Sequence, residues 1–132
     1  MNPELITVHT RDKIAVYVYQ PSVSNGQDPI LFISGGPGGY PNHKVKQFLD
    51  EYARLGYTVY PYDPIGVMES PFPKKTSAYS IAHEVEVVND ILKHYKIDKV
   101  NFIASPYGGN VAPRFITKQQ HSRQGYVSFS LD

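Results

Sequence analysis

The chain has 132 residues, of which 13 are basic and 12 acidic, and its formal net charge is +1. Since these charges are scattered and form no basic stripe, the composition argues against nucleic acid as a partner. The sequence contains no cysteine, which excludes disulfide bonds, thiolate metal sites and cysteine nucleophiles. A chain of this length is expected to form a single domain over residues 1–132 around one hydrophobic core.

The N-terminal half begins with two segments rich in β-branched and aromatic residues, 4–9 and 13–20, which predict a β-hairpin. After a polar loop, the continuous apolar run 30–33 predicts a buried parallel strand that ends in a glycine-rich turn. The spacing of apolar residues then becomes helical, and we expect a helix with Asn42 as its N-cap and Gly56 as its C-terminal stop. Its apolar positions are Val45, Phe48, Leu49, Tyr52 and Leu55.

The C-terminal half contains a second and clearer helix, which begins behind a Ser80 cap. Its apolar stripe consists of Ile81, Val85, Val88, Ile91, Leu92 and Tyr95. Its polar residues are expected to fall largely outside that stripe; they are His83, Glu84, Glu86, Asn89, Asp90 and Lys93. Segments 57–60 and 100–104 predict further strands, and the alternating segment 126–131 predicts a last one.

Strands that alternate with helices after an initial hairpin predict an α/β fold with a mostly parallel sheet. Functional groups in such a fold lie at the carboxyl ends of the strands. The glycine-rich turns at 35–39 and 105–109 both follow predicted strands, so we expect them at the same edge of the sheet. If these two strands are neighbours, the turns face each other across a crevice.

The turn Ser105-Pro-Tyr-Gly-Gly109 stands where a serine hydrolase would hold its nucleophile. The pattern Gly-x-Ser-x-Gly places that serine two residues before the second glycine, on a sharp strand-to-helix corner. Here Pro106 occupies the position, and Ser105 stands one residue too early. Proline is locked at a φ of about −65° and cannot adopt the strained backbone of such a nucleophile. The pair fits a helix start, with Ser105 as N-cap, and the alternative is a displaced Ser105 nucleophile.

Taken together, the motifs of this chain resemble the α/β-hydrolase superfamily. They are Gly35-Gly-Pro-Gly-Gly39 after a strand, Tyr62-Asp63 with Gly66 and Ser70 downstream, and Ala104-Ser-Pro-Tyr-Gly-Gly109. Within the superfamily, the Gly-Gly-Pro-Gly segment is similar to the branch of prolyl aminopeptidases (proline iminopeptidases) and tricorn-interacting aminopeptidases. The resemblance covers about residues 4–132 and implies an incomplete α/β-hydrolase fold of about six strands without a cap domain.

The resemblance also implies roles for individual residues. An oxyanion-hole N–H would come from Gly35 or Gly36 and a second from Tyr107, while the family's nucleophile serine corresponds to Pro106 and its usual histidine before the glycines to Ser34. The family's catalytic acid and histidine come from later strands, so we expect both to be absent from this chain. An intact relative would release an N-terminal residue, often proline, through an acyl-enzyme on serine, without metal or organic cofactor.

Few other residues could rebuild a catalytic triad. His43 follows the first glycine-rich turn and is the candidate base, although a solvated histidine is the commoner case in the first turn of a helix. His9, His83 and His94 lack metal-ligand spacing and are expected at the surface, so no metal site is predicted. Asp63 is interpreted as a loop-capping carboxylate and not as an acid catalyst.

Three functions remain open. The first hypothesis is a prolyl aminopeptidase-like protein that has lost catalysis, because Pro106 fills the nucleophile position and the acid and histidine are missing. The second is an active serine hydrolase or aminopeptidase that uses Ser105, with His43 or a second subunit as base, or that belongs to a longer native chain. The third is a module that binds a small anion or carboxylate, a peptide or another protein through the N–H groups of its glycine-rich turns.

Two expectations concern the surroundings of the protein. No apolar run is long enough to span a bilayer and the first residues lack a signal-peptide pattern, so we expect a cytoplasmic protein that does not contact membranes. Segment 126–131 is apolar on one face alone, which predicts a strand at an exposed edge of the sheet. Such an edge pairs readily with another strand, and we therefore expect a homo-oligomer formed through residues 126–131.

Overall fold

The computed structural model describes residues 2–34, 39–104 and 126–128. Their strands are β1 (Glu4–Thr7), β2 (Lys13–Val16), β3 (Ile30–Ile33), β4 (Val59–Asp63), β5 (Asn101–Ala104) and β6 (Tyr126–Ser128). Their helices are α1 (His43–Arg54), α2 (Ile81–His94) and a short 3₁₀ helix, η1 (Thr76–Tyr79). The predicted hairpin, the predicted helices and the predicted strands in these ranges are all confirmed.

The six described strands form one sheet in the order β1-β2-β4-β3-β5-β6. Strands β4, β3, β5 and β6 are parallel to their neighbours. The hairpin is antiparallel within itself and also joins β4 antiparallel. The sheet is therefore mixed, and the expectation of a mostly parallel sheet overstated the parallel part, because both contacts of β2 run the other way.

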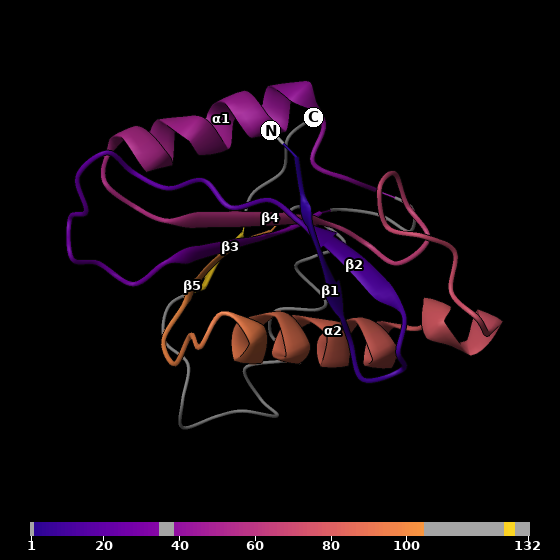
Figure 1. Cartoon of the computed structure of the whole chain (residues 1–132). Coiled ribbons are helices and arrows are strands. Elements are labelled where there is room, and N and C mark those ends of the chain that lie inside the picture. The colour runs from indigo at the N-terminus through magenta and orange to yellow at the C-terminus, as the bar shows by residue number, and fades with distance from the viewer. Residues whose placement is uncertain (1, 35–38, 105–125, 129–132) are drawn as a thin grey trace.

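The sheet lies between the two α-helices, with α1 on one face and α2 on the other (Figure 1). Strand β3 is buried at every position, and its residues alternate between two cores as the two-residue period of a strand requires. Leu31 and Ile33 pack on the α2 side, whereas Ile30 and Phe32 pack on the α1 side. The continuous apolar run of this strand thus reflects a helix on each face.

The starts of both α-helices and the C-terminal end of α1 are explained by single residues that the sequence analysis named. The Asn42 side chain accepts a hydrogen bond from the Val45 N–H at 3.0 Å, and Ser80 Oγ accepts one from the His83 N–H at 3.1 Å. Each bond satisfies a donor that the first turn of a helix leaves unpaired. After α1, Gly56 has a φ of +102°, a conformation that favours glycine, so its role as a helix stop is confirmed.

The polar side of α2 is less exposed than its sequence pattern indicated. His83, Glu84 and Asn89 are all buried, with exposed fractions of 8%, 8% and 9%. Glu84 Oε1 accepts a hydrogen bond of 2.8 Å from the hydroxyl of the buried Tyr62, and burial raises the pKa of this glutamate. The expectation of a surface position for His83 was wrong, because the β1–β2 turn covers this part of the helix and places His9 against it.

The predicted edge strand agrees with the sheet order, in which β6 is the last of the described strands and pairs with β5. Residues 129–131 of the predicted strand lie outside the described residues. Self-association through this edge stays a prediction. Within the described part of the chain, no helix is both long and apolar enough to cross a membrane.

Candidate functional site

The candidate site lies at the edge of the sheet where β3 and β5 end. The two strands are parallel neighbours, and their last residues, Ile33 and Ala104, are partners in the register. The strands that lead into the two glycine-rich turns are therefore neighbours. This is the condition under which the turns are expected to face each other across a crevice. The predicted nucleophile and oxyanion-hole positions, Gly35, Gly36, Ser105, Pro106 and Tyr107, lie outside the described residues, and their roles stay predictions.

Ser34 is the last described residue before the first glycine-rich turn. Its side chain is 4% exposed, and its hydroxyl has no hydrogen-bond partner within the described part of the chain. A buried hydroxyl is usually paired, since leaving it unpaired costs about 1–3 kcal/mol. Among the described residues, the Ser34 hydroxyl is thus left without a partner directly before the turn that the resemblance associates with the oxyanion hole.

Asp63 ends the neighbouring strand β4 at the same edge and is almost completely buried, at 1% exposed. Its Oδ2 accepts hydrogen bonds from the Tyr17 hydroxyl at 2.9 Å and from the Glu69 N–H at 3.2 Å. Burial raises the pKa of the Asp63 carboxyl, although both hydrogen bonds oppose that shift. Burial and the bond to Asp63 also raise the pKa of Tyr17.

A second set of bonds ties the loop after β4 to the hairpin. Ser70 Oγ donates to the backbone oxygen of Asp63 at 2.6 Å and accepts from the Ala15 N–H at 2.8 Å. Together with the bond from Glu69, these contacts fix both ends of residues 63–70. The interpretation of Asp63 as a loop-capping carboxylate is confirmed, and its bonded oxygen is committed to the loop and to Tyr17. No sequence pattern pointed to Tyr17, which lies 46 positions from Asp63.

His43 is the first residue of α1 and is exposed. It lines an open hollow of about 350 Å³ together with Tyr17, Tyr19, Lys46, Gln47 and Asp50. Among the described residues its imidazole has no hydrogen-bond or ion-pair partner. A catalytic base is normally held in one orientation by a third group, which the described surroundings of His43 do not supply.

Among the described residues, the other histidines make different contacts. His94 is partly exposed beside Glu4, and His9 is bonded to Asp90. Within residues 2–34, 39–104 and 126–128, no three histidine or acidic side chains are grouped so that they could hold a metal ion. The described edge therefore offers a fixed carboxylate, Asp63, and an unpaired hydroxyl, Ser34, beside the two glycine-rich turns.

Comparison with known proteins shows the family to which this chain belongs. The family model described as alpha/beta hydrolase fold matches residues 28–125, which include both glycine-rich turns. The proline iminopeptidase of Saccharolobus solfataricus is 29% identical over 115 residues, covering 86% of this chain and 36% of that protein. The proline iminopeptidase of Thermoplasma volcanium is 30% identical over 115 residues, covering 85% and 38%. The chain thus spans a little over a third of the length of these relatives.

Solved structures agree on the fold. An epoxide hydrolase from Vigna radiata superposes with a TM-score of 0.80 at 21% identity, covering 98% of this chain and 39% of that one. The proline iminopeptidase of Mycobacterium smegmatis superposes with a TM-score of 0.75 at 20% identity, covering 91% and 41%. The predicted resemblance to the proline iminopeptidase branch is confirmed by the Saccharolobus and Thermoplasma relatives. The match to the family model extends over well over half of the sequence. The chain therefore belongs to the α/β hydrolase fold family.

Proposed function

We propose that this chain is a prolyl aminopeptidase-like α/β hydrolase that has lost serine-based catalysis. The observation that carries the proposal is Pro106, which stands two residues before Gly108, where the Gly-x-Ser-x-Gly pattern requires the nucleophile. The position is the second residue after β5, the strand after which the family holds its serine. Proline has no nucleophilic side-chain atom, so this position cannot form an acyl-enzyme.

Ser105 is a poor replacement for the missing serine. It stands one residue before the position that the Gly-x-Ser-x-Gly pattern gives to the nucleophile. The candidate base His43 also lacks a described partner that would orient it. These two points favour an inactive protein over an active serine hydrolase built from Ser105 and His43.

The first prediction follows from comparing the wild-type protein with Ser105→Ala and His43→Ala. We expect all three to hydrolyse a proline arylamide and p-nitrophenyl acetate at the same low background rate, because neither residue belongs to a working triad. Release of the coloured product measures the rate, and the Saccharolobus solfataricus relative serves as the matched positive control. Esterase activity that disappears in both variants would establish the rival assignment of Ser105 and His43.

A weak carboxylate-binding function is the second candidate, and the register of β3 and β5 favours it. Because Ile33 and Ala104 are partners, the two glycine-rich turns start side by side, and glycine turns present free N–H groups to anions. Pro37 and Pro106 each remove one such donor, which limits the affinity.

The second prediction concerns the titration of the protein with acetyl-proline. We expect weak binding, on the order of millimolar, which corresponds to about 4 kcal/mol. Amide chemical shifts measured by NMR should change first at Gly36 and Tyr107, the positions of the predicted oxyanion-hole donors. Inorganic phosphate is the control ligand for a general anion site. Shifts scattered over other parts of the chain would contradict a site between the two turns.

A further inference from the structure

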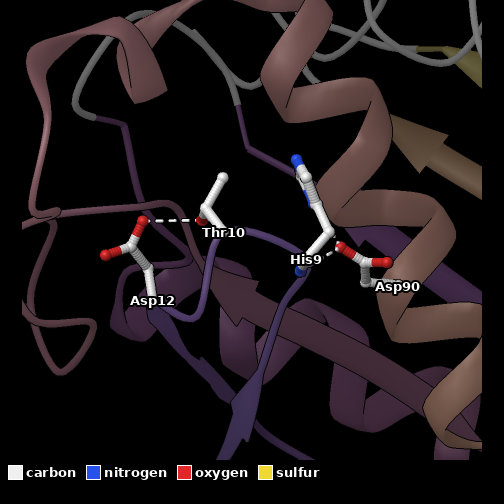
Figure 2. A network of polar contacts seen from close by, with 4 residues as sticks. All are labelled: His9, Thr10, Asp12 and Asp90. Carbon is white, nitrogen blue, oxygen red and sulfur yellow. Dashed lines mark hydrogen bonds and ion pairs between the residues drawn. The ribbon is translucent and has the colours of Figure 1, made fainter.

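A cluster of titratable groups joins the β1–β2 turn to helix α2, on the side of the sheet away from α1. It consists of His9 and Asp12 from the turn and of His83 and Asp90 from the helix, and we call it the histidine clasp. Figure 2 shows His9 beside Asp90, and Thr10 beside Asp12 on the same turn. Asp90 Oδ2 contacts His9 twice, accepting from its N–H at 2.9 Å and meeting its Nδ1 at 2.6 Å.

His83 completes the clasp from the buried side. Its ring centroid lies 4.8 Å from that of His9, with the two planes tilted by 45°. The side chain is 8% exposed, and its Nε2 is buried without a hydrogen-bond partner among the described residues. A proton added at His83 would place a charge in a buried position directly beside a second imidazole.

The clasp also holds a third segment of the chain. Asp12 is 6% exposed, its Oδ2 accepts from Thr10 Oγ1 at 2.6 Å, and its Oδ1 accepts from the Lys74 N–H at 3.1 Å. The bond from Thr10 holds the pKa of Asp12 below its usual value, with the Lys74 N–H and the charges of His83 and Lys74 acting in the same direction. Asp12 therefore remains a carboxylate under mildly acidic conditions.

The two histidines have different surroundings. His9 has a carboxylate partner, because Asp90 Oδ2 lies 2.6 Å from its Nδ1, and this contact joins the turn to the helix. At His83, burial lowers the pKa and the neighbouring His9 lowers it further, while Asp12 and Asp90 act against them. The charged and titratable groups of the cluster come from three elements: the turn supplies His9 and Asp12, the helix supplies His83 and Asp90, and the segment before η1 supplies Lys74.

We propose that His9 and His83 form an acid-sensitive clasp, which holds the β1–β2 turn against α2 near neutral pH and releases it when His83 is protonated. Release follows because the protonated ring needs water or an acceptor, and the turn must separate from the helix before either can reach Nε2. The freed segments are the turn at residues 8–12 and the chain around Lys74, which Asp12 holds.

The sign of the pH dependence follows from the lowered pKa of His83. Its neutral form is favoured in the folded protein, so the associated stability is fully present above the unfolded pKa of about 6.5 and declines as the pH falls below it. The equilibrium constant for unfolding then rises by up to about tenfold for each pH unit, until the folded pKa is reached. Asp12 does not contribute between pH 7.5 and 5.0, because its pKa lies lower still.

The third prediction compares urea unfolding of the full chain and of His83→Gln between pH 7.5 and 5.0. The wild type should lose stability through this range, and the variant should lose much less, because glutamine does not titrate. His43→Gln is the matched control, since it removes an exposed histidine on the other side of the sheet and should leave the wild-type dependence unchanged. Equal losses in the wild type and in His83→Gln would overturn the clasp.

NMR titration of the histidine ring signals provides a second readout, which does not require His83→Gln to fold. His9→Gln should raise the midpoint of His83, because it removes the neighbouring cation, and Asp90→Asn should lower it, because it removes an anion. Protection of the His9 and Lys74 amides against hydrogen exchange, corrected for the intrinsic rate, should fall together as His83 titrates. A His83 midpoint that neither variant moves, or protection that is constant with pH, would refute the proposal.

Discussion

Replacing Asp63 by alanine should lower the free energy of unfolding by roughly 3–5 kcal/mol, a large share of the total stability of a small domain. The substitution leaves the Tyr17 hydroxyl and the Glu69 N–H without their acceptor in a place that water hardly reaches. It also loosens the loop that Ser70 ties to Ala15. Urea unfolding followed by circular dichroism and tyrosine fluorescence measures the change.

Asp63→Asn is the matched control, because an amide oxygen can still accept both hydrogen bonds, and we expect it to cost about 1 kcal/mol at neutral pH. Burial raises the pKa of Asp63, so the folded protein favours the protonated carboxyl. The stability that this protonation contributes is fully present below the unfolded pKa of about 3.8 and is lost as the pH rises through the folded pKa. The stability of the asparagine variant relative to the wild type should therefore increase between pH 4 and pH 7. An alanine variant as stable as the wild type would contradict the loop-capping role.

The replacement of Phe102 by alanine should lower the free energy of unfolding by about 3–5 kcal/mol. Phe102 lies in β5 and is fully buried in the core on the α2 side, so the truncation leaves a cavity under the strand that leads to the candidate site. Phe72→Ala makes the same chemical change at a side chain that is 83% exposed, and it should alter stability by less than about 0.5 kcal/mol. Equal losses in the two variants would mean that β5 is not packed as described.

The sequence was most informative where one local rule determines a structure. Four buried residues in β3 indicate helices on both faces, and the two helix starts follow from Asn42 and Ser80, whose side chains cap the next turn. Whether the strands before the two glycine-rich turns are neighbours depends on topology and was left open by the sequence; the register of Ile33 with Ala104 shows that they are.

The sequence was least informative where a contact depends on segments that are distant along the chain. His83 and Glu84 lie outside the apolar stripe of α2, so the sequence pattern placed them at the surface. The hairpin turn covers His83, however, and the Tyr62 hydroxyl donates a hydrogen bond to Glu84. The partner of Asp63 is Tyr17, which comes directly after β2, and its position beside Asp63 cannot be known before the hairpin is placed in the sheet. The mixed character of the sheet has the same origin, since β2 joins β4 and not β3.

The candidate site itself was predicted from motif spacing, because Gly-x-Ser-x-Gly fixes the nucleophile by position and Pro106 stands at that position. Family membership follows independently from the match over residues 28–125. The proposed loss of catalysis rests on the chemistry of one residue, Pro106, and it is therefore best tested at the positions next to it.

The most direct test is the intact mass of the protein after treatment with a fluorophosphonate, which forms a covalent bond with an activated serine. We expect the unmodified mass for the wild type, since Pro106 offers no nucleophile and Ser105 lies outside the required position. The Saccharolobus solfataricus relative provides the labelled control. A single stoichiometric adduct that maps to Ser105, and that is absent from Ser105→Ala, would show that the protein has an active serine nucleophile and would contradict the proposed loss of catalysis.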